Sequence, residues 1–446
     1  MRARSLLCAI VLGMLALGGV AVGDTSRGGW LEPTVGLSPD GGVEVHVAMA
    51  ADGGAVAVWD GSSGVRAVTR PAGGSWSAPM TLGNLYEPHL AVDARGDAIV
   101  TALQSDSGTA RIVSLAKPAG SPWTSPVPVS AAESDIGWGH DLAANDVGAA
   151  VAAWTAPDGK LWVARAALRR ADGTWGSPEN LGYADFAAPY AAIDARGDAA
   201  VLWTRGSGAA QVYAELRPAG GGWQPAVVLS DSGLGGAKAA LAMNRRGDAL
   251  ALWPEAAGAA GVRFASSYRA ATATEWTAAA ALPFSPTLAL TFDPPSIALD
   301  DQGNATVVAQ TADGRVEVVT RAFGDAAWAG PTVVGDSGSD DPALQDTWCV
   351  DPRVAVDATG RAIVIWGGAA LHAARRDGGW QQLVEVEDAP ACFARSLAID
   401  AMGDAVAVWN ASENAVVRLD AAILDAKPPV LERLAVPRTA RAGRRV

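Results

Sequence analysis

One phrase recurs along this chain and limits what it can fold into. An apolar run meets Asp-x-x-Gly, and a second apolar run follows that usually ends in Trp. The clearest copies read LAVDARGDAIV, AAIDARGDAAVLW, VAVDATGRAIVIW and LAIDAMGDAVAVW, at residues 90–100, 191–203, 354–366 and 397–409. Because each apolar run is short and rich in β-forming residues, the phrase predicts two strands joined by a tight turn.

The phrase occurs eight times at a nearly regular spacing. Successive turn glycines lie 43 to 57 residues apart. Repeats of this length built from strands predict a propeller or a solenoid. The eight glycines are Gly53, Gly96, Gly148, Gly197, Gly247, Gly303, Gly360 and Gly403.

The Asp-x-x-Gly turn has a structural and a functional interpretation. Seven copies have Asp or Asn three residues before the glycine, where a side-chain oxygen can accept hydrogen bonds from the turn amides. Glycine then supplies the positive φ that lets the second strand return. The alternative is a repeated calcium site, but each copy offers few oxygens where calcium takes six to eight. We therefore expect a structural turn.

Tryptophan closes the phrase in most copies. We expect these rings to fill the core between neighbouring sheets rather than to stack on a ligand, because a buried Trp removes on the order of 200 Å² from water. The six residues are Trp59, Trp154, Trp203, Trp253, Trp366 and Trp409.

A third strand and a rim strand complete each repeat. The rim segment opens with Trp, as in GGSWSAP around Trp76 and GGGWQPA around Trp223, and a proline follows closely. Proline is tolerated only on an edge strand, so this segment should form the outer edge of a four-stranded sheet. The eighth repeat lacks a rim segment, whereas RGGWLEPTVGLS around Trp30 precedes the first repeat. We therefore predict an all-β, eight-bladed propeller whose last blade is closed by the N-terminal strand, with seven blades as the alternative.

The two ends of the chain differ from the repeats. A basic start, an apolar run and the small residues Ala-Val-Gly predict a signal peptide over residues 1–23. The propeller is expected over residues 24–426. Residues 427–446 should form a linker or the truncated start of an Ig-like module. The expected location is secreted, either extracellular or in the cell envelope.

The net charge limits the classes of possible partner, and the cysteines predict a covalent link. The net charge of −13 argues against nucleic acid, and the chain beyond the signal peptide has no apolar run long enough to span a membrane. We expect a monomer. Cys349 and Cys392 each lie eight residues before the Asp of their phrases, so they occupy equivalent places in consecutive repeats. In an exported protein this predicts a disulfide.

The hairpin phrase resembles NHL-type and related exported bacterial propeller repeats, and the GGxW rim is similar to that of sialidase-like propellers. The resemblance implies a propeller fold. A sialidase activity would need an arginine trio and a Tyr–Glu pair. Of these, only Arg353 falls at the matching place on an inner strand, and Arg395 is one residue out of register.

A candidate site follows from the position four residues before the Asp of each phrase, where the inner strands should begin around the axis. It contains His46, His89, Asp141, Tyr190, Ala240, Ser296, Arg353 and Ser396, and His140 adjoins Asp141. One interpretation is polar packing around a water-filled channel. The other is a site for a divalent metal or an anionic ligand made by His46, His89, His140 and Asp141. We expect no other cofactor.

Two hypotheses about function follow. The first is a non-catalytic propeller that binds a protein or carbohydrate at its axial face, with Tyr190, Arg353, Trp138 and Trp348 beside the histidines. Free aromatic rings next to acids suit sugars. The alternative is an exported sialidase-like glycoside hydrolase or lyase. No catalytic motif is apparent, so we expect binding rather than catalysis.

Overall fold

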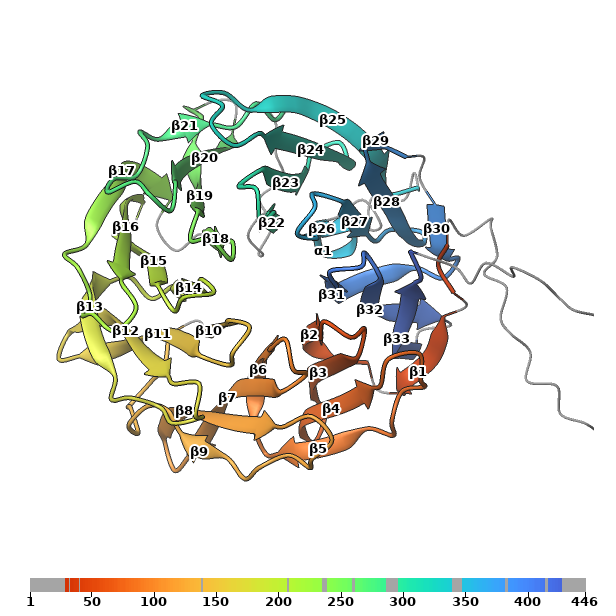
Figure 1. Cartoon of the computed structure of the whole chain (residues 1–446), viewed down its shortest axis with the longest axis horizontal. Helices are drawn as coiled ribbons and strands as arrows, with labels where there is room; N and C mark the ends of the chain where they lie inside the picture. Colours follow the sequence, from red (N-terminus) through yellow and green to blue (C-terminus); the bar gives the residue numbers. More distant parts are fainter. Residues whose placement is uncertain are drawn as a thin grey trace, which may run out of the picture.

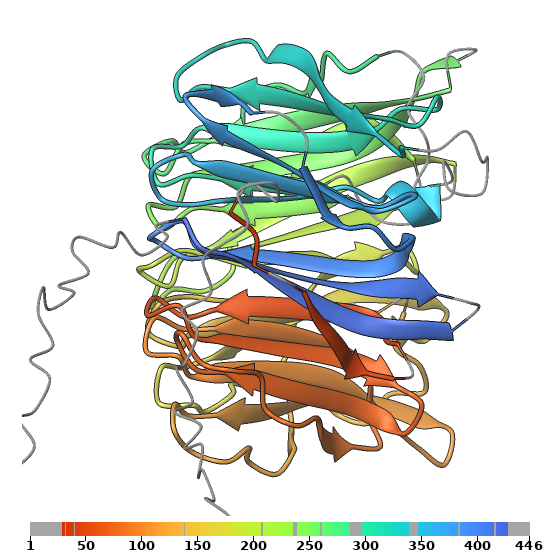
Figure 2. The same ribbon diagram turned by 90° about the vertical axis from the view of Figure 1, so that its right-hand side faces the viewer.

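A computed structural model describes residues 29–426, except for 32, 40, 138, 207, 235–238, 259–260, 286–295, 339–346, 382–383 and 414–415. The predicted signal peptide and the predicted C-terminal segment lie outside the described residues. The described chain forms antiparallel sheets arranged as a ring around a central axis (Figure 1). Seen from the side, the strands run between the two faces of the ring (Figure 2).

Each sheet is ordered from the axis to the rim. The inner strands are β2 (Val43–Met49), β6 (Tyr86–Val92), β10 (His140–Ala144), β14 (Tyr190–Ile193), β18 (Ala240–Met243), β22 (Ser296–Leu299), β26 (Arg353–Val356) and β31 (Ala391–Ile399). The strands that follow the glycine turns are β3 (Ala55–Gly61), β7 (Ala98–Asp106), β11 (Ala150–Asp158), β15 (Ala199–Arg205), β19 (Ala249–Ala256), β23 (Ala305–Gln310), β27 (Ala362–Trp366) and β32 (Ala405–Glu413).

The third strands are β4 (Gly64–Arg70), β8 (Thr109–Lys117), β12 (Leu161–Arg169), β16 (Ala209–Arg217), β20 (Val262–Arg269), β24 (Arg315–Arg321), β28 (Leu371–Asp377) and β33 (Val416–Leu424). The outer strands are β5 (Met80–Gly83), β9 (Val127–Pro128), β13 (Glu179–Ala184), β17 (Val227–Leu234), β21 (Ala280–Ala281), β25 (Ala329–Asp336), β29 (Gly379–Trp380) with β30 (Val384–Glu387), and β1 (Thr34–Ser38).

Five of the sheets have four strands, and the β26–β30 sheet has five. The strands β14–β17 and β18–β21 are joined into one eight-stranded sheet through a single pair, Gly233 with Glu255. Among the described residues, the one α-helix is the short α1 (Thr347–Val350), which lies just before β26.

The Asp-x-x-Gly turns have the predicted structure. All eight turn glycines have φ between 78° and 95°. In a typical copy, Asp93 Oδ1 accepts the backbone N–H groups of Arg95 and Asp97 at 2.9 and 3.0 Å, and Asp93 Oδ2 accepts from the Arg95 guanidinium at 2.7 Å. The carboxylate is therefore occupied by its own turn, which confirms the structural interpretation.

The tryptophans that end the phrase lie in the apolar core between neighbouring sheets, as predicted. All six are at most 2% exposed. Trp59, for example, packs in a cluster that joins β2, β3 and β4 to β32, β33 and β1. Most rim tryptophans precede the outer strands, which differs slightly from the prediction, whereas Trp380 lies within β29. Trp223 lies before Pro225 and β17 begins at Val227, since proline has no N–H to give to the ladder.

The ring is closed by two segments far apart in sequence. Strand β1 pairs with β33, with Thr34 opposite Ala421 and Ser38 opposite Leu419 (Figure 1). Upstream of β1, Leu31 N–H donates to Ile423 O at 2.8 Å. The predicted pairing of the Trp30 segment with the last sheet is confirmed.

The predicted disulfide is also present. Cys349 in α1 is bonded to Cys392 in β31, so the bond joins two consecutive sheets. Cys349 thus lies in a short helix before the inner strand rather than within it. Beside the bond, the buried Arg395 guanidinium donates to the carbonyl oxygens of Cys349, Val350, Asp351 and Ala391 at 2.5 to 2.9 Å. This arginine satisfies carbonyl groups that the short helix leaves without partners.

No helix in the described ranges is long and apolar enough to cross a lipid bilayer.

Candidate functional site

The two faces of the ring differ in what they carry. The Asp-x-x-Gly turns lie on one face, which we call the turn face. The inner strands begin on the opposite face, which we call the mouth face, and it also carries α1 and the loops that lead from each outer strand to the next inner strand (Figure 2). Because binding residues concentrate in loops and strand ends on a rigid scaffold, the mouth face is the first place to look for a site.

The structure brings the predicted site residues to this face. His140, Tyr190 and Arg353 are the first residues of β10, β14 and β26, and Asp141 follows His140. His46 and His89 are the fourth residues of the longer strands β2 and β6. Trp138 lies outside the described residues. Trp348 is in α1, and its side chain is outside the described part of the chain.

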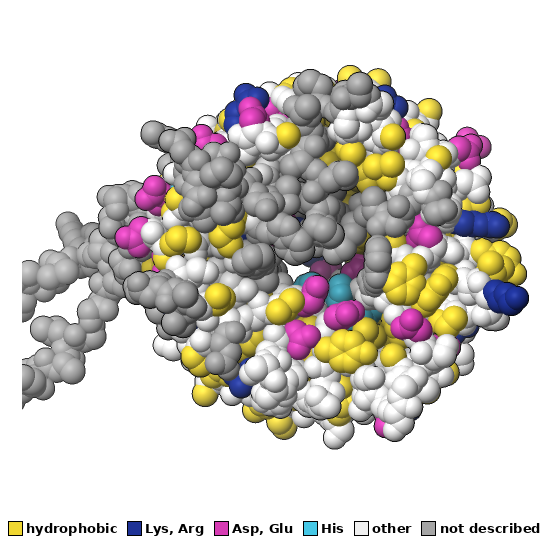
Figure 3. Space-filling view, turned by 180° about the vertical axis from the view of Figure 1, so that it is seen from behind, with side chains coloured by type: hydrophobic (Ala, Val, Ile, Leu, Met, Phe, Trp, Pro, Cys, Tyr) yellow, Lys and Arg dark blue, Asp and Glu magenta, His cyan; other side chains and the backbone are white. Residues whose placement is uncertain are grey.

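Three histidines from successive inner strands have their imidazole rings next to one another. The centroids of His46 and His89 are 4.8 Å apart, and those of His89 and His140 are 4.5 Å apart. Figure 3 shows histidine side chains at the edge of the central opening with acidic side chains beside them. The sequence predicted this proximity from one shared repeat position, but it gave no indication that the rings contact one another in a tilted arrangement, with interplanar angles of 35° and 55°.

His140 has a different environment from His46 and His89. His46 and His89 are half-buried, whereas His140 is 2% exposed and its Nε2 lies 2.9 Å from Thr101 Oγ1. Burial, with His89 and His46 nearby, holds the pKa of His140 well below its ordinary value. His140 is therefore neutral and supports the row, and His46 and His89 are the ligand-accessible members.

Asp141 links this row to the next inner strand. Its Oδ1 is 3.4 Å from His89 Nδ1, and its Oδ2 accepts the backbone N–H of Ala191 in β14 at 2.8 Å. Its side chain is still 25% exposed. Asp141 is thus fixed through both of its oxygens, because Oδ1 also accepts the backbone N–H of Leu142 at 2.8 Å, and its side chain remains partly exposed.

The same repeat position makes similar links elsewhere in the ring. Ser396 Oγ accepts the N–H of Val47, and Ser296 Oγ accepts the N–H of Val354, each at 3.0 Å. Polar packing between neighbouring inner strands is therefore one confirmed role of this position, as the first interpretation of the sequence expected.

Three acidic residues have a left-handed backbone that the sequence analysis did not predict. Glu44, Glu87 and Asp351 have φ of 46°, 51° and 21°, an uncommon conformation for residues other than glycine. Each stands two residues before a mouth position, namely His46, His89 or Arg353. Sequence could have shown this shared offset, but not the backbone conformation.

The acids make this part of the mouth face negative. Glu87 N–H donates to Asp60 Oδ2 at 3.3 Å. Burial raises the pKa of Asp60, and the charge of Glu44 raises it further. The histidine row therefore lies beside several carboxyl groups that repel one another, and these would favour a neutral or cationic ligand over an anionic one.

The two arginines near the axis are engaged by the protein. Arg353 Nη2 donates to Asp351 Oδ2 at 2.8 Å, and Arg395 is the buried carbonyl partner described above. Among the described residues, no three histidine, cysteine or carboxylate side chains are grouped as a metal ion would require.

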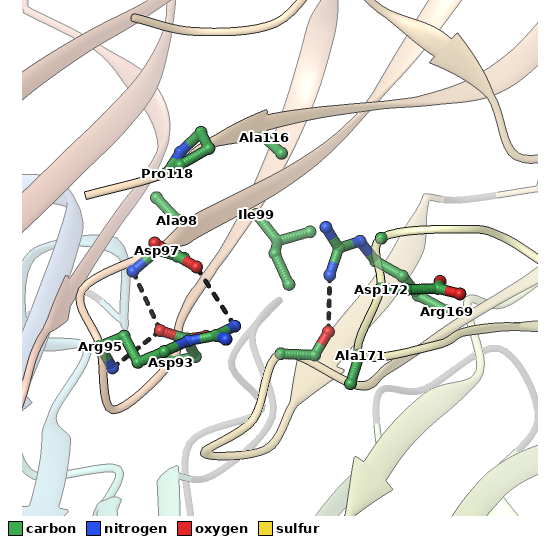
Figure 4. A pocket seen from close by; sticks show the side chains of 12 residues that line it. Asp93, Arg95, Asp97, Ala98, Ile99, Ala116, Pro118, Arg169, Ala171 and Asp172 are labelled. Carbon is green, nitrogen blue, oxygen red and sulfur yellow. Dashed lines mark hydrogen bonds and ion pairs between the residues drawn. The ribbon is translucent and has the colours of Figure 1, made fainter. Parts of the chain in front are cut away.

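A pocket of about 220 Å³ lies on the turn face between the β6–β9 and β10–β13 sheets (Figure 4). Arg95 is paired with Asp93 and Asp97, and Arg169 Nη1 donates to Gly148 O at 2.6 Å. Asp194, Arg196 and Asp198 repeat the first of these arrangements two sheets later, at the turn between β14 and β15. The charged lining is therefore a set of ion pairs and hydrogen bonds that recurs at the turns, and we do not assign the binding site to this pocket.

No protein-family model matches this chain, and no curated protein matches it in sequence. Among solved structures it is similar to the BP39L lectin from Burkholderia pseudomallei, with a TM-score of 0.52 and 15% identity over 79% of this chain and 99% of the lectin. The fold is that of a β-propeller. At this identity the likeness is evidence of fold alone.

Two further solved structures are less similar. The six-bladed fungal lectin of Aleuria aurantia has a TM-score of 0.41 and 10% identity, over 69% of this chain and 100% of the lectin. The Hadza microbial sialidase Hz136 has a TM-score of 0.38 and 12% identity, over 72% of this chain and 74% of the sialidase.

Proposed function

We propose that this protein is a secreted, non-catalytic propeller of eight blades that binds carbohydrate at its mouth face. The blade count treats the eight-stranded sheet as two blades, because a single residue pair joins β14–β17 to β18–β21. The count also agrees with the eight copies of the turn. Secretion is supported by the bonded pair Cys349–Cys392, since such bonds persist in oxidising compartments.

The observation that carries the proposal is the row formed by His46, His89 and Asp141. These side chains come from three successive inner strands, lie side by side and are partly exposed at the central opening. Sugar hydroxyls both donate and accept hydrogen bonds, and imidazole and carboxylate groups match both needs. Because rigid strands hold the row, little conformational entropy is lost on binding.

Carbohydrate is favoured over a protein ligand because the polar groups converge on a concave opening and not on a broad flat surface. A lectin shares this fold at a TM-score of 0.52, so the scaffold itself is compatible with carbohydrate binding. Binding is favoured over sialidase chemistry because Arg353 and Arg395 are already paired with protein groups and are not gathered around one ligand position.

A glycan array tests this function. We expect the protein to bind neutral glycans, and His89→Ala and Asp141→Asn to weaken that binding at least about tenfold, since each removes hydrogen bonds at the opening. Asp172→Asn is the matched control, because Asp172 is an exposed aspartate on the turn face. Thermal unfolding of each variant would show that the fold is intact.

Two results would contradict the proposal. If folded His89→Ala and Asp141→Asn bound as the unmodified protein does, the site would lie elsewhere. If the unmodified protein bound no glycan but captured a protein ligand through the same residues, the ligand class would be wrong.

A further inference from the structure

A second group of aromatic side chains lies on the mouth face, away from the histidine row. It follows the seam between the β10–β13 sheet and the strands β14–β17. Trp162 is near the start of β12, Tyr183 is near the end of β13, and Phe186 is in the loop that joins β13 to β14. All three therefore stand at the mouth-face ends of their elements. We call this group, together with Arg205 at the end of β15, the aromatic seam.

The rings are arranged in two contacts. Trp162 and Phe186 meet edge to face, with centroids 4.6 Å apart and planes at 84°. The exposed Arg205 guanidinium lies over the Tyr183 ring at 5.6 Å from its centroid, which bridges the seam. Tyr183 is 48% exposed, and Trp162 and Phe186 are half-buried.

The loop that carries Phe186 is fixed by hydrogen bonds. Asp185 Oδ2 accepts from Thr204 Oγ1 at 2.6 Å, and Asp185 Oδ1 accepts the N–H of Ala187 at 2.9 Å. The Asp185 N–H in turn donates to Thr204 O at 2.8 Å. Asp185 thus positions Phe186, and the aromatic seam is largely pre-formed.

The fold itself does not require an aromatic side chain at this place. Trp162 pairs with Pro157, nine residues after the turn glycine. At the equivalent place three other third strands have small or aliphatic residues, namely Ala110, Val262 and Val417. A large, partly exposed ring in one of these four repeats is better explained by a ligand than by packing.

We propose that the aromatic seam is a stacking subsite for a neutral oligosaccharide whose other end lies at the histidine row. This inference rests on the proposed function and extends it to the length of the ligand. A sugar ring presents an apolar C–H face that packs on an aromatic ring, and its hydroxyls match the planar guanidinium of Arg205.

The position of the seam sets the minimum size of the ligand. Trp162 is on β12, two strands outward from β10, which carries Asp141. At the usual spacing between strands this is roughly 10 Å along the edge of the sheet. A single sugar cannot occupy both places, so the ligand must be a chain. The carboxyl groups beside the row select a neutral chain over an acidic one.

Calorimetry with free neutral oligosaccharides of one to six units tests the subsite, using a series that the array identifies. We expect affinity to rise with chain length. Trp162→Ala and Tyr183→Ala should weaken binding of the longest member about tenfold and leave the single sugar unchanged, because one stacked ring contributes about that factor. Trp162→Phe keeps a ring and should recover most of the loss.

Phe323→Ala is the matched control. Phe323 is 49% exposed and has Arg246 over its ring at 5.2 Å, but it lies on the turn face. This variant should bind every member of the series as the unmodified protein does.

The outcomes separate the two proposals. If folded Trp162→Ala and Tyr183→Ala bind the longest member normally while His89→Ala does not, the subsite is wrong and the proposed function stands. If they abolish binding while His89→Ala has no effect, the seam is the primary site and the assignment to the histidine row is wrong. If the unmodified protein binds no member, both are overturned.

Discussion

At the scale of single residues, Glu215 departs most clearly from the repeat. It lies on β16 opposite Val201, in the packed region between the β10–β13 sheet and the strands β14–β17, and is 6% exposed. The equivalent residues of the other third strands are small or aliphatic, namely Val68, Leu115, Ala167, Ser267, Val319, Ala374 and Ala422. Burial, with Glu179 nearby, raises the pKa of Glu215 to about 7.

This carboxyl group should make stability depend on pH. Its pKa rises from 4.5 to about 7 on folding, so the folded state holds the proton more tightly. Its contribution to stability is complete below pH 4.5 and is lost as pH rises through 7, by up to about 3 kcal/mol. Glu215→Gln should remove this slope, and urea unfolding at pH 5 and pH 8 measures it.

Two comparisons separate the contribution of Glu215 from other causes of pH dependence. Glu179→Gln should reduce the slope without removing it, because burial is the larger cause of the raised pKa. His140 contributes a slope of opposite sign below its ordinary pKa, so the difference between variant and parent is the quantity to compare. Equal slopes in Glu215→Gln and the parent would show that Glu215 is ionised in the folded protein.

The site could be predicted from sequence only where it follows the repeat. His46, His89 and Asp141 share one offset from the turn, so their proximity was predictable. The burial of Glu215 and the exposure of Trp162 depend on where third strands meet their neighbours, and that register was not visible in one sequence. The left-handed backbone of Glu44 and Glu87 has no marker in composition at all.

At the scale of elements, α1 and β31 are linked by contacts outside the ladders. The link combines the Cys349–Cys392 bond with the buried Arg395 guanidinium, which holds carbonyl groups from both segments. The sequence predicted the bond from the equivalent places of the two cysteines. It did not show Arg395 as their partner, because that role depends on the short helix turning its carbonyl groups inward.

Removing this bond should destabilise the protein without changing its fold. The bond closes a segment of 43 residues, which in the chain-entropy estimate is worth about 4 kcal/mol. The Cys349→Ser/Cys392→Ser double variant should lose about that much in urea unfolding, and reduction of the parent should have the same effect. A loss far below 1 kcal/mol would mean that Arg395 alone holds the two segments together.

At the scale of the whole molecule, the fold was predictable because one local rule is applied many times. Each turn fixes a hairpin, each Trp fixes a contact with the next sheet, and the displaced Trp30 segment fixes the closure. The outer strands were less predictable. Strands β5, β13 and β17 begin after Pro79, Pro178 and Pro225 and not at the rim tryptophans, because the ladder needs N–H groups that proline lacks. In contrast, β25 contains Pro331 and β29 contains Trp380.

The closing strand should account for a large share of the stability. A chain that begins at residue 41 loses the burial of Trp30 and Leu37, which are 3% and 5% exposed, and leaves β33 with an open edge. We expect it to be at least roughly 5 kcal/mol less stable than a chain that begins at residue 29. Leu37→Ala, which keeps the strand pairing, should cost clearly less. Equal urea midpoints for the two chains would show that the ring does not depend on this strand.

The pairing of β1 with β33 also sets an order of events when the chain is made. Strand β1 leaves the ribosome before the other described strands, and it cannot pair until β33 has followed. Until then both ends of the growing stack present open ladders to other chains. The other sheets can therefore form early, whereas the last sheet and the ring are completed only when β1 pairs with β33.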